Sequence, residues 1–166
     1  MIGAGLPATQ RSVDDKKWMR RALRVAGSAT GGDIPVGAVI VGPDGGEIAC
    51  GVNRREAEAD PTAHAEIVAI REASRVLAQH GAGDGWRLED CTLVVTLEPC
   101  AMCAGAAVAA RMGRIVYGAV EPKTGACGSV WDIPRESPLH RTAVTGGVLR
   151  EECEDLIREF FRGLRS

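Results

Sequence analysis

Two cysteines, Cys100 and Cys103, are the residues of this sequence whose spacing most clearly suits chemistry. Pro99 precedes them and indicates the start of a helix, because the backbone N–H that proline lacks would have no partner in a first helical turn. Thiols three positions apart in a helix lie on one face, and the positive end of the helix dipole favours their thiolate forms. The pair is therefore suited to binding a metal or to redox chemistry.

His64 is the candidate third ligand that would distinguish these two chemistries. Structural zinc sites use four protein ligands, whereas catalytic zinc sites use three and keep one position open for water. The sequence contains no second Cys-x-x-Cys pair, and the other histidines, His80 and His140, stand beside a glycine loop and in an irregular segment. A three-ligand zinc site made of His64, Cys100 and Cys103 is therefore the preferred prediction.

Glu66 stands two residues after His64, near the expected start of another helix. Taken alone, a carboxylate at this place is an ordinary first-turn residue that the helix dipole stabilises. Beside an open zinc position the same carboxylate could instead transfer protons. Glu66 is therefore the candidate catalytic acid and base.

The composition favours one folded domain without a global attraction to nucleic acid. The 166 residues are 45% hydrophobic and 25% charged, and the formal net charge is −2, so an RNA partner would have to be bound by a local basic patch. The six cysteines do not imply a disulfide framework in a chain of this length and apolar content. Because the sequence shows neither a signal peptide nor a long apolar segment, we expect a cytoplasmic protein with reduced thiols and no membrane association.

Helical and strand-like segments alternate along the chain, which predicts an α/β domain with crossover helices over a mixed sheet. We expect a flexible leader over residues 1–12 and a single domain over residues 13–166. The two helices that carry the reactive residues begin near strand ends, where open α/β sheets place their ligand sites. The expected helices cover residues 13–28, 60–80, 99–111 and 149–164, and the expected strands cover residues 34–41, 47–51, 91–96, 114–118 and 142–145.

The reactive residues also carry a resemblance to a known enzyme family. Residues 64–66 and 99–103 match the H-x-E and P-C-x-x-C parts of the signature of zinc-dependent nucleobase deaminases. From Trp18 to Arg162 the sequence resembles the bacterial tRNA-specific adenosine deaminases, which convert adenosine to inosine at the anticodon wobble position. The resembling segments are Trp18–Arg20, Pro35–Val39, Asn53–Arg54, Asp60–Glu66, Val95–Cys100, Met102–Ala106, Lys123–Gly125 and Phe160–Arg162.

This resemblance implies a three-layer α/β/α sandwich of the cytidine-deaminase type with a mixed central sheet, assembled as a homodimer. It also implies one Zn²⁺ per chain, which His64, Cys100 and Cys103 would bind and which would lower the pKa of its bound water to about 7. Glu66 would accept the proton of that water and deliver it to the ring nitrogen and then to the leaving ammonia. The expected enzyme is a hydrolase that acts on an amidine carbon–nitrogen bond, with adenosine in a tRNA anticodon loop as its substrate.

The resemblance assigns further residues to the substrate. Asn53 would hydrogen-bond the flipped base or its ribose, and Val36 and Leu97 would form part of the pocket wall. A loop base suits such a pocket, because it can be splayed out at a lower cost than a base paired in a duplex. The candidate RNA contacts are Lys123, Arg54 and Arg162.

Two alternative functions stay open at this point. A deaminase of the same fold that acts on a free base or nucleoside, such as guanine or cytosine, would share every catalytic residue. The Lys123–Gly125 and Phe160–Arg162 segments favour tRNA, through the resemblance alone. A non-catalytic zinc or redox module built on Cys100 and Cys103 is the other alternative, but such a module has no use for the carboxylate of Glu66.

Overall fold

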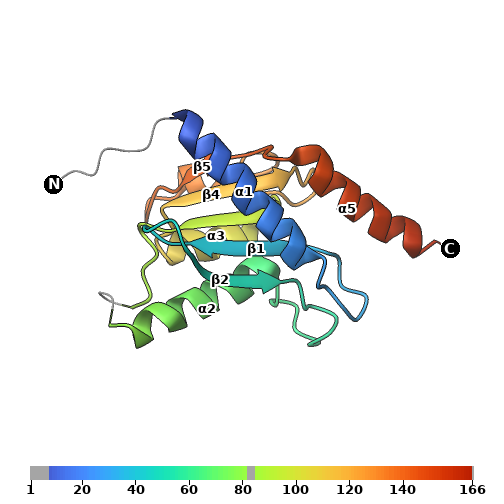
Figure 1. Ribbon diagram of the computed structural model, residues 1–166, viewed down its shortest axis with the longest axis horizontal. Coiled ribbons are helices and arrows are strands. Elements are labelled where there is room, and N and C mark those ends of the chain that lie inside the picture. The colour runs from blue at the N-terminus through green and yellow to red at the C-terminus, as the bar shows by residue number, and fades with distance from the viewer. Residues whose placement is uncertain (1–7, 82–84, 166) are drawn as a thin grey trace.

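Five strands form the central sheet of the molecule: β1 (Gly37–Val41), β2 (Glu47–Val52), β3 (Thr92–Leu97), β4 (Arg114–Ala119) and β5 (Ala143–Thr145). They lie in the order β2-β1-β3-β4-β5 in the computed structural model (Figure 1), which describes residues 8–81 and 85–165. β1 pairs antiparallel with both β2 and β3, whereas β3, β4 and β5 are parallel to one another. The sheet is therefore mixed, as predicted.

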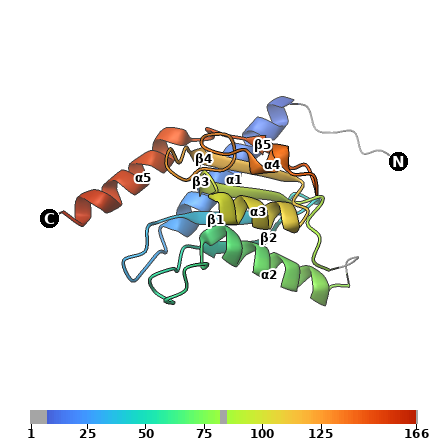
Figure 2. The same ribbon diagram turned by 180° about the vertical axis from the view of Figure 1, so that it is seen from behind.

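Helices cover both faces of this sheet. They are α1 (Ala8–Ala26), α2 (Ala65–Gln79), α3 (Ala101–Ala109), α4 (Ile133–Glu136) and α5 (Arg150–Gly163). α1 and α5 pack on one face, which Figure 1 shows toward the viewer, and α2 and α3, with the short α4, cover the face seen from behind in Figure 2. This arrangement confirms the expected three-layer α/β/α sandwich.

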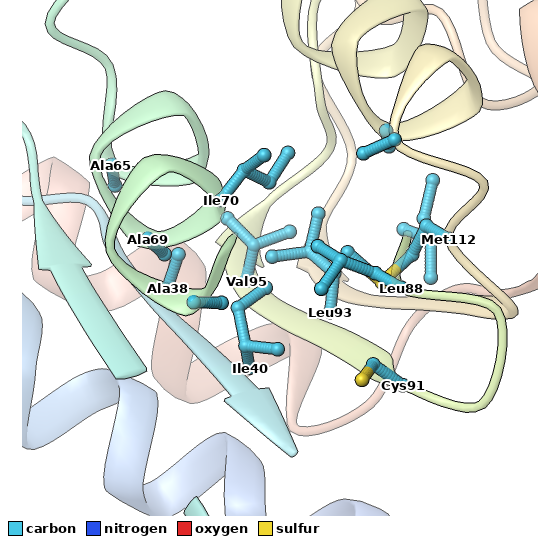
Figure 3. Close-up of a cluster of buried hydrophobic side chains, with 14 of the residues drawn as sticks. Ala38, Ile40, Ala65, Ala69, Ile70, Leu88, Cys91, Leu93, Val95 and Met112 are labelled. Atoms are coloured by element: carbon cyan, nitrogen blue, oxygen red, sulfur yellow. The ribbon is translucent and has the colours of Figure 1, made fainter. Parts of the chain in front are cut away.

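Alternating side chains of the strands divide the hydrophobic core into two halves. In β1, Ala38 and Ile40 belong to the half beneath α2 and α3, whereas Val39 and Val41 pack with α1 on the opposite face. This division follows from the two-residue repeat of a strand. Figure 3 shows Ala38, Ile40 and Val95 side by side beneath α2. Because both faces are covered, the central strands are mainly apolar on both sides.

The first turn of α2 begins later than the sequence predicts. The helix starts at Ala65, and the expected start at Asp60 was wrong. The Asp60 carboxylate instead accepts hydrogen bonds from the backbone N–H of Thr62 at 2.8 Å and from its hydroxyl group at 2.7 Å. Asp60 and Pro61 thus form a turn that leads into the helix.

Other elements also differ from those expected, and three of the differences concern helices. α1 begins at Ala8, so residues 8–12 of the expected flexible leader are helical, and residues 1–7 of that leader lie outside the described residues. α3 begins at Ala101 with Cys100 as its N-cap residue, so Pro99 precedes the helix instead of opening it. α4 lies in a stretch expected to be irregular, with Pro134 in its first turn, where a missing N–H has no cost.

The described residues include no helix that is both long enough and apolar enough to cross a membrane. Each of the six cysteines is a free thiol, as expected. The cytoplasmic location stays a prediction.

Candidate metal centre and active site

The predicted ligands His64, Cys100 and Cys103 lie together in the structure. The Nδ1 atom of His64 is 3.7 Å from the sulfur of Cys100 and 3.5 Å from the sulfur of Cys103. The ligand atoms of the three residues all lie within 4.8 Å of one another. Cys103 is buried, and the other two are partly buried and accessible from the pocket described below. The fold thus joins residues that are up to 39 positions apart in the sequence.

The topology of the sheet explains this convergence. β2 and β3 both run antiparallel to β1, so they run in the same direction and end on the same side of the sheet. His64 is the N-cap residue of α2, which follows β2 after a loop, and Cys100 is the N-cap residue of α3, which directly follows β3. Two helix N-termini therefore meet at this end of the sheet, and their dipoles favour anionic ligands there.

The donor set fits a zinc ion. Imidazole nitrogen and thiolate sulfur are typical zinc ligands, and three protein ligands leave one coordination position open. Hydrogen bonds from the Cys103 thiol and from His64 lower the pKa of Cys100 to about 4. The hydrogen bond with Cys100 raises the pKa of His64, and that bond together with burial raises the pKa of Cys103. These shifts favour a thiolate at Cys100 and protonated His64 and Cys103. A bound metal cation can take the place of the protons on these two groups.

Glu66 is buried at the start of α2, beside the ligand cluster. The residue is 4% exposed, and burial raises the pKa of its carboxyl group to about 7. A carboxyl group with such a pKa can both accept and release a proton near neutral pH. The environment of Glu66 therefore suits the proton transfer expected of it.

A pocket with a volume of about 160 Å³ opens over the cluster. Asn53, Val36 and Leu97, the residues expected to bind the substrate, all line it. The side-chain amide of Asn53 donates a hydrogen bond to the carbonyl oxygen of Ile34 at 3.1 Å, which fixes its orientation and leaves its second N–H for a ligand. The wall also includes Ile34, Arg55, Glu98, Glu121 and Thr124.

The three expected RNA contacts lie outside this pocket. Arg54 forms an ion pair with Glu58 at 3.3 Å on the exposed surface. Lys123 is exposed in the loop that follows β4, and Arg162 is exposed on α5. Arg55, the neighbour of Arg54, lines the pocket. The structure thus does not bring Arg54, Lys123 and Arg162 to the ligand cluster, and their contacts with RNA stay predictions.

Glu98 is a residue of the site to which the sequence motifs assign no role, although it lies within the resembling segment Val95–Cys100. It immediately precedes Pro99, is 2% exposed, and accepts hydrogen bonds from the backbone N–H groups of Glu121, Cys127 and Ser129. The available signal was its position, because a carboxylate at the end of an apolar buried strand must find several hydrogen-bond donors.

An α/β/α sandwich that brings a histidine, two cysteines and a buried glutamate to one pocket has the architecture of the zinc-dependent nucleobase deaminases. Residues 12–119 match the family described as the cytidine and deoxycytidylate deaminase zinc-binding region. The chain belongs to this family, and it is therefore a hydrolase of carbon–nitrogen bonds.

Individual members of the family differ in how similar they are to this chain. The chain is 43% identical over 154 residues to the tRNA-specific adenosine deaminase of Bacillus subtilis (strain 168), with 92% of this chain and 91% of that protein covered. A solved structure from studies of A-to-I editing by tRNA deaminases at the wobble position is 40% identical, with a TM-score of 0.75, and covers 84% of this chain and 98% of its own. The guanine deaminase of Nitrosomonas europaea is 26% identical, with a TM-score of 0.69 and 96% of each chain covered. The chain is thus more similar to the tRNA deaminases than to this guanine deaminase.

Proposed function

We propose that this chain is a zinc-dependent deaminase that converts adenosine to inosine at the wobble position of a tRNA anticodon. The observation that carries the proposal is the pocket that joins His64, Cys100, Cys103 and Glu66. The adenosine substrate is supported by the 43% identity with the tRNA-specific adenosine deaminase of Bacillus subtilis, which extends over nine-tenths of both chains.

The proposed mechanism assigns one Zn²⁺ to His64, Cys100 and Cys103. When bound, the ion supplies Lewis-acid activation, so that water becomes a nucleophile near neutral pH. Glu66 accepts a proton from the attacking water and donates it to the ring nitrogen of adenine, which weakens the aromatic amidine. Glu66 then transfers the second proton of the water to the leaving amine, so that adenosine and water give inosine and ammonia.

The walls of the pocket orient the base for this reaction. Val36 and Leu97 exclude water from its faces, and Asn53 offers a hydrogen-bond donor to the base or its ribose. An unpaired base of an anticodon loop enters such a pocket without the cost of breaking a duplex pair. Lys123, Arg54 and Arg162 are exposed cations, and we assign them to the phosphates around this loop.

The proposed assembly is a homodimer. The large apolar side chains of Met102, Val130 and Trp131 are exposed, with Trp131 52% exposed. The backbone N–H groups of Val130 and Trp131 both donate to the Gly125 carbonyl, and Gly125 forms a β-bridge with Cys100, so this surface adjoins the pocket. A second copy of the chain would cover it. Sedimentation equilibrium tests this assembly, and a monomer at micromolar concentration would contradict it.

The decisive test of function is an assay on an anticodon stem-loop. A stem-loop with adenosine at the wobble position should yield inosine, which nuclease digestion and mass spectrometry detect. A stem-loop with guanosine at that position and adenosine elsewhere in the loop is the matched control and should be unchanged. Deamination of free guanine or cytosine without reaction of the stem-loop would replace this proposal with a free-base deaminase.

A further inference from the structure

Glu98 is a buried carboxylate at the junction between β3 and the metal-binding segment. Its Oε2 atom accepts a hydrogen bond from the N–H of Glu121, and its Oε1 atom accepts hydrogen bonds from the N–H groups of Cys127 and Ser129, each at 3.1 Å. Hydrogen bonds to an ionised acceptor are about twice as strong as those between neutral groups. A single side chain therefore holds both ends of the segment 121–129.

This segment is one wall of the pocket. Glu121 and Thr124, in the first half of the segment, line the pocket. Gly125, in the middle of the segment, forms an isolated antiparallel β-bridge with the ligand residue Cys100. The position of the wall and the position of the ligands are therefore set by the same stretch of backbone.

The contact between the wall and Glu98 leaves no free space. A Cβ atom on Gly125 would lie 2.5 Å from Oε2 of Glu98, 2.5 Å from the carbonyl oxygen of Glu121 and 2.3 Å from the hydroxyl oxygen of Ser129. The Ser129 hydroxyl also donates a hydrogen bond to the Glu121 carbonyl at 3.0 Å, which closes the segment into a compact loop. Only a residue without a side chain lets the loop lie against the carboxylate.

We propose that Glu98 is a positioning residue for the deamination. Its carboxylate fixes the segment 121–129 so that the base lies in register with Glu66 and the metal ligands, and it acts through the backbone of the segment without contact with the reacting atoms. This inference rests on the proposed function. A substrate misplaced by about 1 Å can react about 100-fold more slowly, so a loose wall has a measurable effect.

The test uses the full-length zinc-loaded protein and the adenosine stem-loop. In Glu98→Gln the side chain keeps its length but exchanges one acceptor oxygen for an NH2 group, so at least one of the three hydrogen bonds is lost. We expect kcat to fall about tenfold and KM to change less, because a base held out of register with Glu66 reacts more slowly even when it is bound. Zinc content should stay at one per chain, and amide hydrogen exchange should become faster only within residues 121–129.

Gly125→Ala disturbs the same contact from the loop side while the buried carboxylate stays in place, and it should give the same combination of results. This second variant keeps the test informative if Glu98→Gln does not fold. Glu89→Gln is the matched control, because Glu89 is an exposed glutamate just before the start of β3, whereas Glu98 is buried just after its end. Its kcat, KM, zinc content and hydrogen exchange should equal those of the wild type.

The outcomes separate positioning from a general structural role. Unchanged kcat and unchanged exchange in both variants would overturn the proposal, and so would loss of zinc with fast exchange throughout the sheet. If the wild type does not deaminate the stem-loop, the proposed function fails. Hydrogen exchange still decides the role of Glu98 in that case: faster exchange confined to residues 121–129 supports it, and unchanged exchange contradicts it.

Discussion

Gly51 in β2 lies directly against the backbone of Ala65, the first residue of α2. A Cβ atom on Gly51 would lie 2.3 Å from the carbonyl oxygen of Ala65 and 2.7 Å from the backbone nitrogen of Ala69. Only glycine permits this approach. The contact fixes the start of α2 against the sheet, and with it the positions of His64 and Glu66.

Gly51→Ala should therefore affect both stability and metal binding. Overpacking of this kind costs about 1–3 kcal/mol of the free energy of unfolding, and the shift of α2 moves His64 away from the two cysteines. Urea denaturation and a competition titration with a zinc chelator measure the two effects. Gly105→Ala is the control: its Cβ would meet nothing within 4 Å, and alanine is favoured over glycine in a helix by about 1 kcal/mol. Equal denaturation midpoints for Gly51→Ala and the wild type would contradict the argument.

The roles of Glu66 and Cys103 can be separated by measuring zinc and turnover in the same samples. Glu66→Gln keeps the three ligands and should keep one zinc per chain, but its amide cannot transfer protons, so kcat should fall by at least about 100-fold. Cys103→Ala removes a ligand and should lose both zinc and activity. Metal analysis by mass spectrometry checks the pair. Loss of zinc in Glu66→Gln would assign Glu66 to the metal instead.

Cys153 provides a pH-dependent test of the packing of α5 on β4. The residue is fully buried, and burial raises the pKa of its thiol to about 12. In the unfolded chain the pKa of a cysteine thiol is about 8.5. Above that pH the unfolded state binds fewer protons than the folded state, so the stability that depends on this group falls as the pH rises toward 12.

Cys153→Ala removes this titration. Between about pH 8 and pH 10, the free energy of unfolding of the wild type should therefore fall by about 2 kcal/mol relative to that of the variant. Urea denaturation at the two pH values measures it. Val116→Ala, which removes an apolar group from the same half of the core, should show a difference from the wild type that does not change with pH. A constant difference for Cys153→Ala as well would mean that the thiol ionises without unfolding.

The ligand cluster could be predicted from the sequence because its chemistry is restrictive. Few residue types bind zinc, and helix starts limit where two of them, such as Cys100 and Cys103, can stand. The sheet could be predicted for a similar reason, since short β-branched runs such as Thr92–Leu97 favour a buried strand over a helix. Both predictions depend on short sequence patterns, which can be recognised without knowledge of contacts between distant parts of the chain.

Asp60 and Glu98 show where local patterns fail. An aspartate before a proline is equally typical of a helix cap and of a turn, because the same carboxylate accepts a backbone N–H in both. The close packing of Gly51 against Ala65, which the residues around Asp60 do not show, is consistent with a helix that begins at Ala65. The backbone partners of Glu98 lie 23 to 31 positions further along the chain, so no short motif could show them.

Asn53→Ala and Arg54→Ala distinguish the two ways in which neighbouring residues hold the substrate. Asn53 lines the pocket and has a free N–H for the base, so its loss should lower kcat/KM on the stem-loop about tenfold at any salt concentration. Arg54 is exposed beside Glu58, so its loss should raise KM at low salt only and reduce the dependence of KM on salt. Steady-state kinetics at two salt concentrations measures both. A salt-dependent defect in Asn53→Ala together with a salt-independent one in Arg54→Ala would exchange the assignments, because phosphate contacts are screened by salt and contacts inside a closed pocket are not.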